Sequence, residues 1–126
     1  MAASTQISVE EYLHTTFRPD CDYVDGEVRE RNFGEYGHSR PQALFCAYFV
    51  VREQQWRVRV LPEQRVQVKV NRFRIPDICV LRLDAPYEQI VTVAPLICIE
   101  ILSKDDTFKS VNDRLEDYAS MGVPNV

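Results

Sequence analysis

The chain has 126 residues, which is enough for one domain of ordinary size and too few for two independent cores. Hydrophobic residues make up 45% and charged residues 27%, with 7 Pro and 4 Gly, so the composition excludes disordered low-complexity material and fibrous proteins. Fifteen Lys and Arg against 19 Asp and Glu give a net charge of −4, which argues against a protein that coats nucleic acid through bulk positive charge. Any contact with phosphates must be local.

The sequence predicts a protein of the cytoplasm without a membrane segment. No apolar run approaches the roughly 20 residues needed to cross a bilayer, and the N-terminus lacks a basic segment followed by an apolar stretch. The four cysteines form no zinc-binding motif, and Cys46, Cys79 and Cys98 lie in apolar stretches where thiols behave as small buried hydrophobes. We therefore expect reduced thiols.

The first half of the chain predicts two helices and a hairpin. Ser8 before two glutamates is typical of a helix start, so a short helix is expected near 8–15. The Asp25-Gly26 pair between β-prone pieces predicts a hairpin of strands 21–24 and 27–32. A longer helix is expected over 38–53, with Pro41 tolerable only in its first turn.

The second half predicts strands and a closing helix. Apolar residues alternate from Trp56 to Val60 and from Val66 to Val70, as in half-buried strands. The nearly continuous apolar runs 75–83 and 95–102 predict the middle of the sheet. A helix over 105–121 should end at Gly122. The fold class expected is α/β, with a mixed sheet flanked by helices in a single domain spanning residues 1–126.

Each of the two predicted central strands contains one acid. Asp77 shares a strand face with Ile75 and Cys79, and Glu100 shares one with Cys98, so adjacent strands could direct both carboxylates toward one point. Paired buried carboxylates repel each other, and a hard divalent cation such as Mg²⁺ relieves that repulsion. The structural alternative is that Asp77 ends a strand and Glu100 pairs with a nearby Arg.

Three ordered segments carry a family resemblance: Ile75-Pro76-Asp77-Ile78-Cys79-Val80, Ala94 to Ser103 and Asp113 to Pro124. Together with the hairpin around Gly26 and with His38, they resemble the Uma-two family of restriction endonucleases, within the PD-(D/E)XK nuclease superfamily. The resemblance covers nearly the whole chain and implies a restriction-endonuclease-like core. Family members continue past Gly-Val-Pro into a Trp-containing strand, which leaves open a C-terminal truncation here.

The resemblance also assigns site residues. It implies that Asp77 and Glu100 bind the metal, Mg²⁺ or Mn²⁺, and that Glu27 is an acid completing the site. Glu27 as a solvated residue after a tight turn is the structural alternative. His38 matches a histidine at the start of the family's long helix and would touch the scissile phosphate or orient a water; its alternative is a capping or surface residue.

The superfamily lysine is where this chain departs from the pattern. The expected position, two residues after Glu100, holds Leu102. The family's other lysine position, on the last helix, holds Arg114, which keeps the charge and can bind a phosphate bidentately. Lys104 and Lys109 are substitutes to test. This departure bears on turnover more than on metal or DNA binding.

Basic residues cluster in the middle of the chain. Seven of the 15 Lys and Arg residues fall there: Arg52, Arg57, Arg59, Arg65, Lys69, Arg72 and Arg74. They would form either a solvated sheet face or a local strip that contacts DNA phosphates.

The leading hypothesis is a metal-dependent endonuclease that hydrolyses DNA phosphodiester bonds, with Asp77 and Glu100 holding Mg²⁺ and Arg114 or Lys104 stabilising the transition state. Cleavage of both strands of a duplex calls for a two-fold homodimer. The rival hypothesis is a catalytically degraded module that kept the nuclease fold and acts in binding or assembly.

Overall fold

The computed structural model describes residues 6–126. The expectation that the N-terminus carries no targeting signal rests in part on residues 1–5, which lie outside this range. Helices and strands are largely grouped along the chain, with five strands in succession from Val58 to Ile99, which is an α+β arrangement. The elements are α1 (Val9–Leu13), β1 (Asp22–Val24), β2 (Glu27–Arg29), α2 (Tyr36–Val50), α3 (Glu53–Trp56), β3 (Val58–Pro62), β4 (Val66–Lys69), β5 (Arg72–Arg74), β6 (Ile78–Arg82), β7 (Ile97–Ile99) and α4 (Phe108–Met121). No helix within the described range has both the length and the hydrophobicity of a membrane span.

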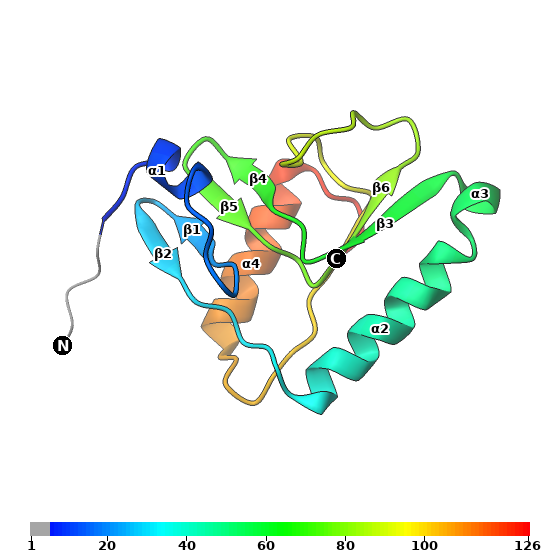
Figure 1. Ribbon diagram of the computed structural model, residues 1–126, viewed down its shortest axis with the longest axis horizontal. Coiled ribbons are helices and arrows are strands. Elements are labelled where there is room, and N and C mark those ends of the chain that lie inside the picture. The colour runs from blue at the N-terminus through cyan, green and yellow to red at the C-terminus, as the bar shows by residue number, and fades with distance from the viewer. Residues whose placement is uncertain (1–5) are drawn as a thin grey trace.

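The strands form two antiparallel sheets instead of one mixed sheet. The first has the order β2-β1-β5-β4 and the second the order β3-β6-β7. Parallel pairing in the described part of the chain is confined to isolated bridges, Val66 with Val91 and Ile97 with Asn125. Figure 1 shows the two sheets side by side, with the β1/β2 hairpin and α1 at one end and β3 with α2 at the other.

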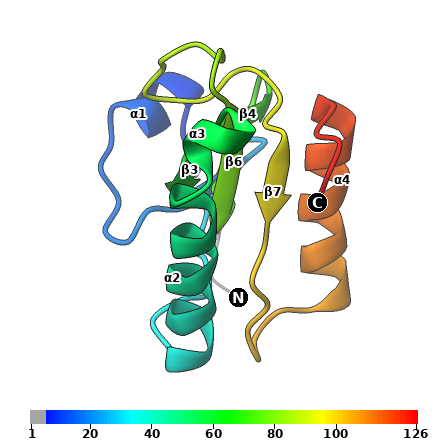
Figure 2. The same ribbon diagram turned by 90° about the vertical axis from the view of Figure 1, so that its right-hand side faces the viewer.

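The three-stranded sheet lies between two helices. In Figure 2, α2 stands on one side of β3, β6 and β7, and α4 stands on the other. Successive side chains of β6 point to opposite faces of the sheet. Ile78 and Val80 pack with Phe49 of α2, whereas Cys79 and Leu81 pack with Tyr118 of α4. β6 is therefore the central buried strand that its apolar run predicts.

Helix boundaries follow local signals. Ser8 caps α1 by accepting a hydrogen bond from Glu11 N, and Thr107 opens α4 with a capping box shared with Ser110. Gly122 ends α4 at φ 101°, a left-handed conformation that glycine adopts readily.

Some predicted boundaries were wrong. Trp56 closes α3 instead of opening a strand, because Arg57 takes a left-handed conformation at φ 55° and β3 begins after it. The helix α2 begins at Tyr36, two residues before the predicted start, which places Pro41 in its second turn. β7 is only three residues long and lies at an edge of its sheet, where Asn125 pairs with Ile97.

Candidate functional site

The register of β6 and β7 brings Asp77 and Glu100 together. Ile78 pairs with Ile99, so one further step places Asp77, just before β6, opposite Glu100, just after β7. Residues directly opposite in an antiparallel pair project to the same face. Both carboxylates line one small cavity, whose walls include Asp22, Arg31, Asp106 and Arg114. The predicted meeting of the two acids is thus observed at the end of these strands.

Asp77 is held firmly in place. Its Oδ1 accepts hydrogen bonds from Arg31 Nη2 and His38 Nε2, both at 3.0 Å, and its Oδ2 accepts one from Ile101 N at 2.6 Å. The backbone N–H of Ile101 follows β7 and has no partner among the described strands, because β6 begins only after Pro76 and Asp77. The Asp77 side chain accepts its hydrogen bond instead. The carboxylate is 4% exposed, and donors from three segments of the chain fix its orientation.

The environment of Glu100 disfavours the charged form of its carboxyl group. Burial, followed by the nearby charge of Asp77, raises its pKa to about 8, although a hydrogen bond from Tyr118 and the charge of Arg114 act in the opposite direction. Tyr118 Oη donates to Oε1 at 2.5 Å, and Arg114 Nε lies 3.6 Å from Oε2. Added positive charge beside this group would favour its ionised form.

Asp22 is a third acid of the cavity, which the sequence analysis missed. It lies on β1, and its Oδ2 accepts a hydrogen bond from Arg74 Nη1 at 3.1 Å. Its Oδ1 is buried and has no hydrogen-bond partner. Burial is the main cause that raises the pKa of Asp22. A signal was present in the sequence, since an acid that opens a buried strand of a hairpin is unusual.

His38 is part of the site. It lies in the first turns of α2, is 3% exposed, and bonds Asp77 from the side opposite Ile101 N. Gln42, one helical turn later, donates to the backbone oxygen of Asp77 at 3.0 Å. The placement makes His38 a buried partner of Asp77 and not a surface or capping residue.

The basic residues named as substitutes for the missing lysine differ in position. Arg114 lines the cavity and donates to Asp106 Oδ1 at 2.8 Å. Lys104 is 71% exposed and pairs with Glu35 at 3.0 Å, while Lys109 pairs with Asp113 on α4. Leu102 is exposed. Among the described residues that line the cavity there is no lysine, so Arg114 is the better placed of these cations.

Glu27 is not brought to the cavity. It lies at the turn end of the β1/β2 hairpin, opposite Val24, and its carboxylate pairs with Arg29 at 3.3 Å. Asp22 lies at the other end of the same hairpin, opposite Arg29. The hairpin therefore contributes an acid to the site, but at a different position from the one predicted.

The central basic cluster does not form one open strip. Three of its members are in short ion pairs: Arg65 with Asp20, Arg72 with Asp25 and Asp117, and Arg74 with Asp22 and Asp117. Arg52 lies over the ring of Tyr48, with its guanidinium carbon 3.8 Å from the ring centre. These arginines connect elements of the fold, so their positive charge is largely offset by neighbouring acids or stacked on aromatic rings.

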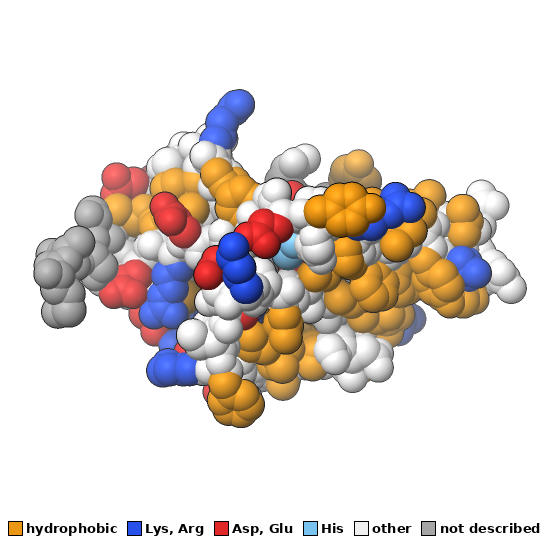
Figure 3. Space-filling model, turned by 90° about the horizontal axis from the view of Figure 1, so that it is seen from below, with side chains coloured by type: hydrophobic (Ala, Val, Ile, Leu, Met, Phe, Trp, Pro, Cys, Tyr) orange, Lys and Arg blue, Asp and Glu red, His pale blue; other side chains and the backbone are white. Residues whose placement is uncertain are grey.

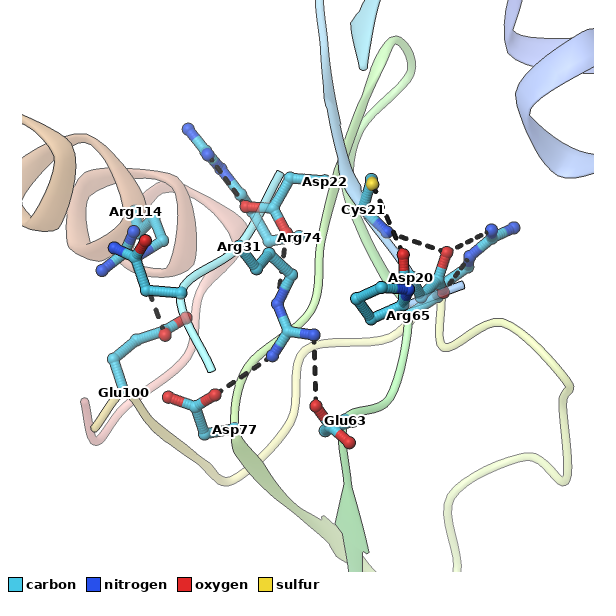
Figure 4. A network of polar contacts seen from close by, with 12 residues as sticks. Asp20, Cys21, Asp22, Arg31, Glu63, Arg65, Arg74, Asp77, Glu100 and Arg114 are labelled. Carbon is cyan, nitrogen blue, oxygen red and sulfur yellow. Dashed lines mark hydrogen bonds and ion pairs between the residues drawn. The ribbon is translucent and has the colours of Figure 1, made fainter. Parts of the chain in front are cut away.

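The cavity can be tested as a metal site from its donor atoms. Hard divalent cations prefer carboxylate oxygens, and the cavity offers those of Asp77, Glu100 and Asp22, among them Asp22 Oδ1, which accepts no hydrogen bond. It has about 20 Å³ open to the centre of a water molecule, enough for one small occupant. Within residues 6–126, no three His, Cys, Asp or Glu side chains are gathered closely enough to hold a metal as they stand. The oxygen donors are of the kind that a divalent cation prefers, but arginine nitrogens lie among them (Figure 4).

Comparison with known proteins identifies the family. The Uma2 family model, described as putative restriction endonuclease, matches residues 9–126. The chain belongs to the Uma2 family. The match spans both sheets and α4, so the Uma2 chain carries all three segments on which the resemblance was based.

A solved structure supports the same assignment. The Uma2 chain is similar to a putative nuclease belonging to DUF820 from Anabaena variabilis, with a TM-score of 0.81 and 25% sequence identity. The similarity covers 93% of this chain and 70% of that one. No curated protein matches the sequence. The restriction-endonuclease-like fold expected from the sequence is confirmed.

Proposed function

We propose that this protein is a metal-dependent endonuclease that hydrolyses DNA phosphodiester bonds. The observation that carries the proposal is the convergence of Asp77 and Glu100, with Asp22, on one cavity at the strand ends. Family and fold support a nuclease of restriction-endonuclease type. The cofactor we assign is Mg²⁺ or Mn²⁺, held by Asp77 and Glu100. Asp22 is better placed than Glu27 to contribute a further oxygen.

Each residue of the site would have a separate role in the reaction. A bound Mg²⁺ would supply Lewis-acid polarisation of the phosphodiester and an activated water nucleophile. His38 and Ile101 N would keep the Asp77 carboxylate oriented. Arg114, held by Asp106, would place positive charge where the phosphate becomes more negative. Lys104, on the exposed segment before α4, would contact DNA if it leaves Glu35.

DNA cleavage can be measured directly. Purified protein with Mg²⁺ or Mn²⁺ should cut plasmid or single-stranded DNA, and Asp77→Ala or Glu100→Ala should lower the rate at least 100-fold by removing a metal ligand. Asp84→Ala is the matched control, because Asp84 is 71% exposed and lies at the far end of β6. Intact DNA with the wild-type protein, or unchanged cleavage by Asp77→Ala, would contradict the proposal.

The rival function is a nuclease-fold module for binding or assembly. One observation favours it: the described lining of the cavity contains Arg114 and Arg31 but no lysine. Calorimetric titration separates the two functions. Metal binding that Glu100→Ala abolishes supports the nuclease, whereas DNA binding without metal binding or cleavage supports the module.

Two further parts of the proposal concern setting and assembly. We place the protein in the cytoplasm, and the free, buried thiols of Cys21, Cys79 and Cys98 support that setting. We also propose a homodimer, because cleavage of both strands of a duplex is most simply performed by two copies related by a two-fold axis.

A further inference from the structure

Arg31 occupies an unusual position for an arginine that follows a surface hairpin. Its side chain is 9% exposed and turns inward just after β2. Each guanidinium nitrogen faces a different carboxylate: Nη2 lies 3.0 Å from Asp77 Oδ1, Nη1 lies 3.4 Å from Glu63 Oε1, and Nε lies 3.8 Å from Asp22 Oδ1. Figure 4 shows the Arg31 guanidinium between these acids.

The three acids come from separate parts of the fold. Asp22 lies on β1, Glu63 in the connection from β3 to β4, and Asp77 immediately before β6. Arg31 therefore joins the two sheets at the cavity. Buried carboxylates from separate elements are stable together only when a cation offsets their repulsion. In this structure, Arg31 supplies positive charge to both buried acids, Asp22 and Asp77, and Arg74 also pairs with Asp22.

Arg31 also limits what else Asp77 can bind. A carboxylate oxygen has two lone pairs, and both on Asp77 Oδ1 are used, one by Arg31 and one by His38. Asp22 Oδ1 has no hydrogen-bond donor, and Arg31 Nε lies 3.8 Å from it. A divalent cation drawn to these oxygens must therefore displace the Arg31 guanidinium or bind against its charge.

We infer that Arg31 is a resident counter-cation that competes with the divalent metal for Asp77 and Asp22. This inference rests on the proposed metal site and adds a regulatory element to it. The site passes between a state closed by Arg31 and a state open to metal, in which the guanidinium is released toward solvent. Metal affinity is then set partly by how strongly Arg31 is held.

Titration with Mn²⁺ alone tests this inference. Arg31→Met keeps much of the length of the side chain and removes its charge, so Mn²⁺ should bind at least tenfold more tightly by calorimetry than to the wild-type protein. Arg31→Lys keeps the charge and should stay near the wild-type affinity. Arg82→Met is the matched control, because it removes the same charge from a side chain that is 71% exposed and pairs with Asp84, far from the cavity.

A second measurement tests the inference if the Arg31→Met variant is less stable than the wild type. Without Arg31, Asp22 and Asp77 repel each other more strongly, so Arg31→Met should have a lower Tm than the wild type without metal and a larger rise in Tm on adding Mn²⁺. If Arg31→Met is unfolded without metal, circular dichroism replaces calorimetry. Refolding by Mn²⁺ supports the inference, and failure to refold at concentrations that saturate the wild type overturns it.

The outcomes separate this inference from the proposed function. Wild-type binding of Mn²⁺ with equal or weaker binding by Arg31→Met overturns the role of Arg31 and leaves the metal site intact. An equal gain in Arg82→Met overturns it too, because the effect would then be general electrostatics. Absence of Mn²⁺ binding in the wild type and in Arg31→Met overturns the metal site, and with it both proposals.

Discussion

The Glu100 carboxyl group is buried and lies near a second acid, Asp77. A folded-state pKa of about 8, against 4.5 for the free group, means that the folded protein holds a proton there that the unfolded chain releases. The contribution of Glu100 to stability is therefore fully present below about pH 4.5 and is lost as the pH rises toward 8. Asp22, whose pKa is also raised, acts in the same direction.

We expect Glu100→Gln to remove this pH dependence. Without metal, the free energy of unfolding of the wild type should fall between pH 5 and 8 relative to that of Glu100→Gln, with a difference in slope of up to about 1.4 kcal/mol per pH unit for one proton. The glutamine retains the size of the side chain and an oxygen that can accept from Tyr118. Urea denaturation at several pH values, without divalent ions, measures the slope.

Glu116→Gln provides the control, because Glu116 is exposed on α4, where its side chain accepts a hydrogen bond from Asn112. Its curve should parallel that of the wild type. Parallel curves for wild type and Glu100→Gln would show that Glu100 is ionised at little cost.

At the level of elements, α4 is joined to the four-stranded sheet through a buried carboxylate. Asp117 is 2% exposed and accepts from Arg74 Nε at 2.8 Å and from Arg72 Nη1 at 2.9 Å. Arg74 continues the network to Asp22 in the cavity. The link explains how β5, with two arginines in three residues, lies inside a sheet.

Asp117→Asn should destabilise the protein by about 3 kcal/mol, because it leaves the buried Arg74 without its compensating charge. Asp113→Asn is a matched control on the same helix. Asp113 pairs with the exposed Lys109 at i,i+4, so its replacement should cost under about 0.5 kcal/mol. Chemical denaturation measures both values, and equal losses for the two variants would contradict a structural role of the buried network.

The elements also mark where sequence reasoning succeeds. Strong local signals located the Asp25-Gly26 hairpin, the apolar run of β6 and the stop of α4 at Gly122, each within a few residues. The strand β5 was missed because it carries two arginines, of which Arg74 is buried against partners far along the chain, Asp22 and Asp117. Pairing of this kind has no local signature.

The same distinction between local and long-range signals applies to the site residues. Strand parity correctly brought Asp77 and Glu100 to one face, since alternation is a local property. An acid that opens a buried strand marked Asp22 as unusual, but its place at the cavity, like that of Arg31, depends on how the hairpin packs against the second sheet, which sequence spacing does not give. The family resemblance pointed to Glu27, whereas Asp22 of the same hairpin lines the cavity, and only the strand pairing fixes which end of the hairpin meets it.

For the whole molecule, the outer face of α2 and α3 stands out. Leu44, Tyr48 and Val51 follow a helical spacing of four and three, and their exposed fractions are 53%, 47% and 77%. Trp56 of α3 is also exposed. Figure 3 shows hydrophobic side chains gathered over this end of the molecule. Continuous apolar surface of this kind is typical of protein contacts.

We expect this face to form the contact of the proposed homodimer. Size-exclusion chromatography with light scattering should give twice the monomer mass of 14.7 kDa for the wild type at micromolar concentration. Leu44→Glu with Val51→Glu should give a monomer, because two buried charges in each copy would oppose association. Val70→Glu is the control, since Val70 is 84% exposed at the turn between β4 and β5, and it should remain dimeric. A monomeric wild type would remove the dimer from the proposal, and a dimeric double variant would move the contact to another face.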